Sequence, residues 1–113
     1  MEAMLITEEV VFKEPKKAND FPAGEHEIRH SEKGKQLIYV LLADERIAKV
    51  KQGTGAAVEQ ATMMMGNDKS KYLSSLMAGC IEIDGRPLVM EELAELPMKS
   101  YMRLQLAFSE LNF

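Results

Sequence analysis

The sequence predicts an α+β domain that is predominantly α-helical, with short N-terminal antiparallel strands followed by a bundle of about four to five helices. Three observations favour this fold. The run KQLIYVLLA at 35–43 is rich in branched and aromatic apolar residues, as buried strands are. Apolar residues recur at helical spacing over much of the chain after it. The 113 residues, 46% of them hydrophobic, suit one domain with its own core, which we expect to span 1–113.

The first 24 residues carry weak structural signals. EEVVFKE, at 8–14, could form a short strand. PKKANDFPAG, at 15–24, is rich in proline, asparagine, aspartate and glycine, which favour turns. We therefore expect 1–24 to be a partly mobile N-terminal segment. Its first residues have no basic region and no long apolar run, so they do not resemble a signal peptide.

A strand hairpin is expected at 25–42. EHEIRH, at 25–30, offers only Ile28 as an apolar anchor and is typical of an edge strand. KQLIYVLLA is typical of a buried strand. The segment SEKG between them ends in Gly34, which suits a four-residue turn.

Residues 43–113 are expected to form the helical part of the domain. In ADERIAKVKQ, at 43–52, Ile47 and Val50 stand one helical turn apart, and Asp44 could cap the N-terminus of the first helix.

Two further helices are expected after the glycine-containing break GTG at 53–55. Alanine and methionine favour helix, which predicts the second helix at 56–65. The third should run from about Asp68 to Cys80. One face of this third helix is apolar and consists of Tyr72, Leu73, Leu76, Met77 and Cys80.

The stretch CIEIDGRPLVMEELAELP, at 80–97, predicts a tight turn and a short helix. Asp84 and Gly85 suit the two positive-φ positions of a type I′ turn. The acidic MEELAEL segment is typical of a helix start, and Pro97 should end that helix. The last helix, at 98–111, has an apolar seam suited to packing on another helix, made by Tyr101, Leu104, Phe108 and Leu111.

Charge and composition exclude several classes of protein. The net charge is −4 and the isoelectric point about 5.2, whereas a domain that binds nucleic acid normally shows a basic face. A single cysteine cannot form an internal disulfide, which fits a reducing compartment. No segment approaches the ~20 apolar residues of a membrane span. We expect a soluble, cytoplasmic protein without nucleic-acid or membrane partners.

The acids of 80–97 and its cysteine could be interpreted as a metal or catalytic site. The turn and the helix start account for the acids more simply, and a cysteine at the end of an apolar face is usually a small buried hydrophobe. A reactive thiolate needs an exposed, electropositive setting, which nothing around Cys80 supplies.

His26 and His30 are the other candidates for chemistry, since on a helix they would share a face and could bind a metal. On an extended strand they would lie ~13 Å apart, too far to chelate. We expect no catalytic, cofactor-binding or metal-binding residues, and no enzyme.

The apolar surface is the more informative signal. Met63, Met64 and Met65 are consecutive in a predicted helix, so they cannot all face one core. In the last helix, apolar residues also lie beside the seam. Either these faces bind a partner or a second copy of the chain, or the strand layer covers them. The candidate partner-binding residues are Met63, Met64, Met65, Tyr101, Met102, Leu106 and Phe108.

The C-terminal half, YLSSLMAGCIEIDGRPLVMEELAELPMKSYMRLQLAFSELNF, resembles the tail assembly chaperones of long-tailed bacteriophages and prophages, in the group that includes the Mu-like proteins. The shared pattern is a helix ending in small residues, the IDG of Ile83–Gly85, a short helix ending in Leu96–Pro97, and a helix with spaced aromatic and leucine residues. The resemblance covers 70–113 best. One departure is that Val89 and Met90 stand where these proteins usually start the short helix with Thr or Ser.

The resemblance implies a cytoplasmic protein that is absent from the mature virion. Such chaperones bind the tape measure protein, keep its apolar helices in solution and help to recruit tail tube subunits. Methionine-rich, adaptable apolar surface and a net charge of −4 are compatible with this role. Two alternatives are another small phage assembly factor, of baseplate hub type, and an acidic adaptor or inhibitor of a host protein.

Overall fold

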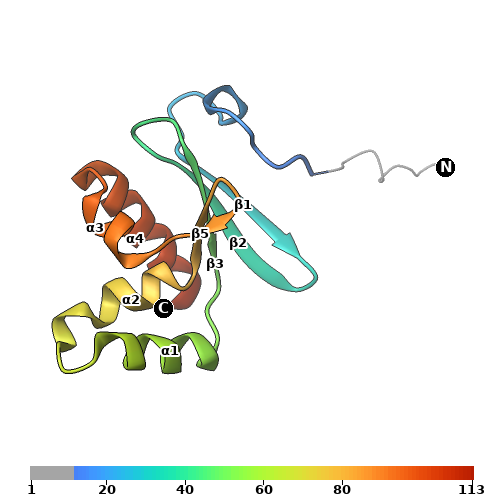
Figure 1. Ribbon diagram of the computed structural model, residues 1–113. Helices are drawn as coiled ribbons and strands as arrows, with labels where there is room; N and C mark the ends of the chain where they lie inside the picture. Colours follow the sequence, from blue (N-terminus) through green and yellow to red (C-terminus); the bar gives the residue numbers. More distant parts are fainter. Residues whose placement is uncertain (1–11) are drawn as a thin grey trace.

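The computed structural model describes residues 12–113, which form a five-stranded antiparallel sheet and four α-helices (Figure 1). The strands follow one another across the sheet in the order of the chain. They are β1 (Glu27–Glu32), β2 (Lys35–Leu41), β3 (Ile47–Lys51), β4 (Ile81–Ile83) and β5 (Arg86–Pro87).

The helices lie in the C-terminal half of the chain, on one side of the sheet. They are α1 (Gly55–Met65), α2 (Tyr72–Ala78), α3 (Met90–Glu95) and α4 (Met98–Asn112), with a 3₁₀ turn, η3 (Lys69–Lys71), before α2. α4 packs across β2 and β3, while α2 packs against β4 and α3. α1 packs against α2 and η3, at the bottom of the view in Figure 1.

The main core lies between the sheet and the helices. Alternate residues of the strands, such as Ile38, Val40 and Val50, point into it and meet Leu104 and Phe108 of α4. All five are at most 1% exposed. This period-2 pattern of burial is what a sheet with one covered face produces.

The opposite face of the sheet carries a second, smaller apolar cluster, formed by Phe21, Leu37 and Tyr39. Residues of the N-terminal segment cover part of it. The ring of Phe12 stacks on His30, with centroids 3.7 Å apart, and lies 5.7 Å from the ring of Tyr39.

The prediction of a predominantly helical fold is wrong, because strands extend well beyond the N-terminal hairpin. The segment 43–52, expected to be the first helix, is instead a turn followed by β3. Ala48 and Val50 are buried while Lys49 and Lys51 face the other side, which is strand alternation. β3 pairs with both β2 and β4, so backbone hydrogen bonds from distant parts of the chain override its helical propensity.

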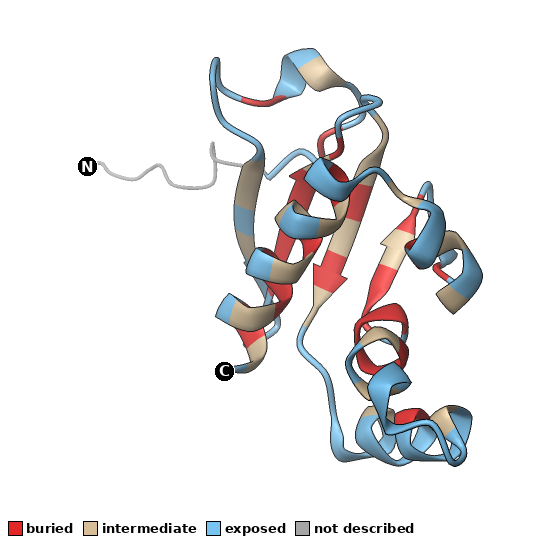
Figure 2. Cartoon of the chain, turned by 90° about the vertical axis from the view of Figure 1, so that its left-hand side faces the viewer, coloured by how far each residue is buried: buried red, intermediate tan, exposed pale blue. Residues whose placement is uncertain are grey.

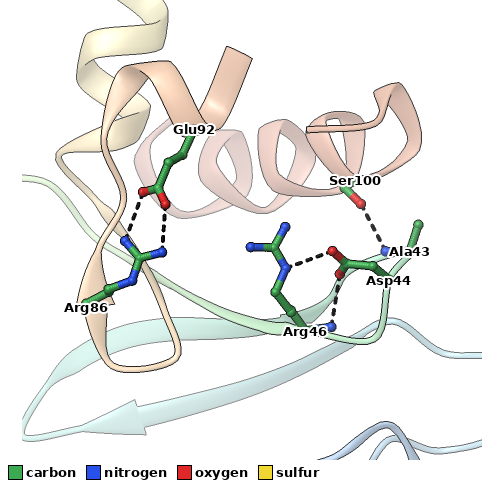
Figure 3. A network of polar contacts seen from close by, with 6 residues as sticks. All are labelled: Ala43, Asp44, Arg46, Arg86, Glu92 and Ser100. Carbon is green, nitrogen blue, oxygen red and sulfur yellow. Dashed lines mark hydrogen bonds and ion pairs between the residues drawn. The ribbon is translucent and has the colours of Figure 1, made fainter. Parts of the chain in front are cut away.

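The predicted helical bundle is also wrong, because the seam of α4 packs on the sheet rather than on another helix. Asp44, expected to cap a helix, lies in the β2–β3 turn, where its side chain accepts hydrogen bonds from the backbone and guanidinium of Arg46 (Figure 3). In the same view, the Ser100 hydroxyl accepts a hydrogen bond of 3.0 Å from the Ala43 N–H. This bond ties the start of α4 to that turn.

Both predicted hairpin turns are present. β1 and β2 pair in antiparallel register, with Lys33 and Gly34 at positive φ between them, so the turn has two residues rather than four. Asp84 and Gly85 adopt φ of 54° and 81°, as the IDG motif predicts, and join β4 to β5. Positive φ at both positions is the type I′ requirement that these residues meet at low cost.

Of the segment 1–24, which was expected to be partly mobile, residues 1–11 lie outside the described part of the chain, and so does most of the strand expected at 8–14. Within the described part, residues 12–14 form no strand. Pro15 and Phe21 are buried, and a short 3₁₀ turn, Ala18–Asp20, lies between them. The Asp20 carboxylate accepts hydrogen bonds from the backbone N–H groups of Lys16 and Lys17.

Candidate functional site

Long apolar side chains are exposed on two helices, α1 and α4. Most of the 11 residues of α1 are exposed, and Figure 2 colours this helix mainly pale blue. Only Ala61 of this helix is buried. Met63 is 80% exposed and Met64 54%, whereas Met65 is half-buried. An amphipathic helix normally buries a broader stripe than this, so much of the apolar surface of α1 has no cover within residues 12–113.

Local sequence signals set the residues at which α1 begins and ends. The Thr54 hydroxyl accepts a hydrogen bond from the N–H of Ala57, which caps the N-terminus. Gly66, at positive φ, ends the helix. Before the cap, the N–H of Gly53 donates a 2.7 Å hydrogen bond to the side chain of Asn112, which links this connection to the end of α4.

The exposed apolar surface of α4 is a straight stripe. Met98, Met102 and Leu106 stand four residues apart, on one side of the helix, and are 81%, 48% and 60% exposed. Of the other candidates on this helix, Tyr101 is half-buried against the core and Phe108 is 1% exposed within it. The Phe108 side chain is therefore a core group and not an accessible contact.

The structure thus separates the candidate residues instead of bringing them into one patch. Met63 and Met64 belong to the α1 surface, and Met102 and Leu106 to the α4 stripe. Met98 was missed, although its spacing of four from Met102 was visible in the sequence. Val58 on α1, Val89 before α3 and Phe113 are further exposed apolar residues, and no sequence period connects them.

A groove beside α1 is lined mostly by apolar residues. It is a hollow of about 360 Å³ between α1, α2 and the β5–α3 connection. Ala61 and Met64 line it from α1, Ser75 and Ala78 from α2, and Val89 from the connection. Met64 and Val89 are large exposed apolar residues of this lining.

Glutamates are concentrated on the two helices that border this groove. α1 and α3 together contain four glutamates, Glu59, Glu91, Glu92 and Glu95, and no lysine or arginine. Glu92 forms two hydrogen bonds of 3.0 and 2.7 Å with the Arg86 guanidinium (Figure 3). These bonds hold the pKa of Glu92 below its usual value of 4.5. The other three side chains are exposed and form no ion pair within the described residues.

Glu92 also explains how α3 starts without the Thr or Ser that the resemblance leads one to expect. Val89 is the N-cap residue and has no side chain that can accept a hydrogen bond. Instead, a Glu92 carboxylate oxygen accepts from the Val89 N–H at 3.4 Å, which supplies one half of a capping box.

A second hollow, of about 520 Å³, lies at the lysine-rich end of the open sheet face. Lys35, Lys49 and Lys51 line it. Lys51 is paired with Glu82 at 2.7 Å, and Glu32 also lines the hollow, so its charges are mixed. This arrangement does not single out one class of ligand.

Cys80 and the histidines show no catalytic arrangement. Cys80 is buried, and burial raises the pKa of its thiol, which disfavours the reactive thiolate. His30 is stacked on Phe12 at the sheet edge. Among residues 12–113, no three histidine, cysteine or acidic side chains lie together as metal ligands would.

Comparisons of the chain with protein-family models, curated proteins and solved structures return no match. In the part of the chain that the structure covers, no helix has the length and apolar character needed to cross a membrane.

Proposed function

We propose that this protein is a tail assembly chaperone of a long-tailed bacteriophage or prophage. In this role it would bind the tape measure protein and help to recruit tail tube subunits in the host cytoplasm. The resemblance of 70–113 to such chaperones suggests the partner. The observation that carries the proposal is the exposure of long, flexible apolar side chains, above all Met63 and Met64, on a helix that buries one residue.

Exposed methionines suit a partner whose surface is apolar and not unique in shape. The thioether chain is unbranched and polarizable, so it can adapt to different apolar faces. A small protein seldom leaves large apolar groups together on its surface unless they meet another molecule. Burial of one methionine on binding would contribute on the order of 1–2 kcal/mol, given about 25 cal/mol per Å² of apolar surface.

Co-expression with a fragment of the tape measure protein tests the proposal. The chaperone should raise the soluble fraction of that fragment and co-purify with it. Met64→Glu on α1 and Leu106→Glu on α4 should each weaken co-purification at least about tenfold, because a carboxylate would be buried without a partner. Ala56→Glu adds the same carboxylate at an exposed position of α1 and is the matched control.

Two results would contradict the proposal. One is a tape measure fragment that stays insoluble and does not co-purify with the unaltered protein. The other is full binding by both Met64→Glu and Leu106→Glu, which would show that neither helix surface is the contact.

A further inference from the structure

β1 is a free edge of the sheet. It pairs with β2, and no other segment among residues 12–113 pairs with it (Figure 1). The Leu41 N–H donates to the His26 carbonyl, and bonded pairs alternate along an antiparallel ladder. The even-numbered residues of β1 therefore bond to β2, which leaves the backbone N–H and C=O groups of Glu27, Arg29 and Ser31 directed outward. Such an edge can accept a further strand.

The outward-directed residues carry opposite charges next to each other. Arg29 stands opposite Ile38 of β2, which points into the main core, and Glu27 lies two residues away on the same face. Ile28, between them, points to the other face of the sheet and packs against the smaller apolar cluster. The edge thus offers one acidic, one apolar and one basic side chain in succession.

Neither charge of this edge is fully compensated within one copy of the chain. Arg29 donates to Glu110 through Nη2, while its Nη1 and Nε form no hydrogen bond within the described residues. Glu27 Oε1 lies 3.6 Å from the same Nη2, which is too long for a hydrogen bond. Partial burial and the nearby Glu110 raise the pKa of Glu27, because both disfavour its charged form. A second guanidinium beside Glu27 would stabilise that form.

The edge is complementary to a second copy of itself. Antiparallel pairing of two β1 edges brings odd-numbered residues opposite odd-numbered ones. If the two-fold axis passes between the two Ile28 residues, Glu27 of each copy faces the partner's Arg29. A shift by two residues puts Arg29 opposite Arg29 in one direction and Glu27 opposite Glu27 in the other. Opposite charges directly across a strand pair stabilise it and like charges destabilise it, so charge selects this register.

We propose that the chain forms a two-fold symmetric dimer through β1, in which the two sheets join into one continuous antiparallel sheet. About four backbone hydrogen bonds and two Glu27–Arg29 pairs cross the seam, and the two Ile28 side chains meet on the axis. This interface is small, so the dissociation constant should be on the order of micromolar. The inference does not rest on the proposed function.

The surroundings of β1 leave room for the second copy. A hollow of about 610 Å³ lies along the edge, lined by residues 25–29 and by Pro22, Arg103 and Leu106. A two-fold axis perpendicular to the sheet keeps both α4 helices on one side of the joined sheet. The two β2 strands would lie about 14 Å apart, three strand spacings, so the two Leu106 side chains border the seam from opposite sides. The α4 stripe therefore stays accessible to another partner.

Charge reversal at the seam tests the dimer in the full-length protein. Sedimentation equilibrium over a wide range of concentrations measures the association constant, and the unaltered protein should dimerise. Glu27→Arg and Arg29→Glu each place like charges opposite one another at both pairs, so each should weaken association at least about tenfold. Circular dichroism verifies that each variant is folded.

An equal mixture of these two variants provides the decisive comparison. In a mixed dimer the two reversed side chains face each other and so do the two native ones, which restores opposite charges at both pairs. The mixture should associate about tenfold more tightly than either variant alone. The matched control, Glu32→Arg, reverses an exposed charge on the same strand outside the charged pairs and should leave the dimer unchanged.

Three results would overturn the inference: a monomer at every concentration, a mixture that associates no better than its components, or equal weakening of the dimer by Glu32→Arg. These measurements need no tape measure fragment. A dimer of a protein that fails to solubilise that fragment would uphold the inference and contradict the proposed function. A monomer that solubilises and binds the fragment would do the reverse.

Discussion

Replacement of Phe108 by alanine should destabilise the fold by about 3–4 kcal/mol, the range typical of a large-to-small core change. The ring is 1% exposed and belongs to the main core. Burial of a phenylalanine is worth roughly 1.5–3 kcal/mol. A residual cavity of about 50 Å³ adds about 1.2 kcal/mol, at about 24 cal/mol per Å³. The variant also removes the edge-to-face partner of Phe113, whose ring centroid is 5.8 Å away.

Urea unfolding followed by circular dichroism measures this loss directly. Leu106→Ala is the matched control, since Leu106 lies two residues away on the same helix but is 60% exposed. It should change the free energy of unfolding by less than about 0.5 kcal/mol. A Phe108→Ala loss below about 1 kcal/mol, or an equal loss in Leu106→Ala, would refute the assignment of Phe108 to the core and Leu106 to the surface.

Three further changes test particular contacts. Gly53→Ala places a Cβ 3.0 Å from the Cys80 sulfur and should lower the free energy of unfolding by roughly 1 kcal/mol. Much of this loss should be recovered in the double variant with Cys80→Ala, because the smaller side chain relieves the close contact. Strictly additive losses of unfolding free energy would argue against this close packing. Thr54→Ala removes the N-terminal cap of α1 and should destabilise that helix by about 1 kcal/mol. Amide hydrogen exchange should become faster in α1 and stay unchanged in the core of α4. Faster exchange throughout the protein would contradict a local effect. Glu92 has a lowered pKa in the folded state, so its contribution to stability is present above pH 4.5 and is lost as the pH falls through the folded pKa. Arg86→Gln removes the ion-pair partner and should raise the pKa of Glu92 toward 4.5 in an NMR titration. An unchanged titration midpoint would refute the pairing.

Local signals in the sequence predicted where the helices α1 to α4 lie and where both hairpins turn, although the β1–β2 turn is two residues long and not four. These signals act within a few residues. The GTG break supplies a helix cap, Pro97 fixes φ, and the pair Asp84–Gly85 adopts positive φ. Their consequences are therefore nearly independent of the rest of the fold. Cys80 is buried as expected, but it lies in the turn between α2 and β4 and not on the helix face from which its burial was predicted.

β3 shows where local reasoning fails. Ile47 and Val50 satisfy a helical spacing, while Ala48 and Val50 satisfy strand alternation, so the segment is compatible with both structures. The sheet decides between them, because β2 and β4 offer backbone partners on both sides, and β4 lies more than 30 residues further along the chain. A window of ten residues contains no information about those partners.

The sequence by itself determined the approximate places of the four α-helices, the Asp84–Gly85 turn, an acidic charge balance and an excess of methionine, but it also predicted a helix at 43–52 where β3 lies. Tertiary structure alone decided which apolar residues are core and which are surface. The helical period placed Phe108 on the seam and Leu106 beside it, but the packing of α4 over β2 and β3 decided that the seam is buried against the sheet while Leu106 stays exposed. The groove beside α1 likewise exists only once α2 and the β5–α3 connection lie next to it, since cavities arise from packing between distant segments.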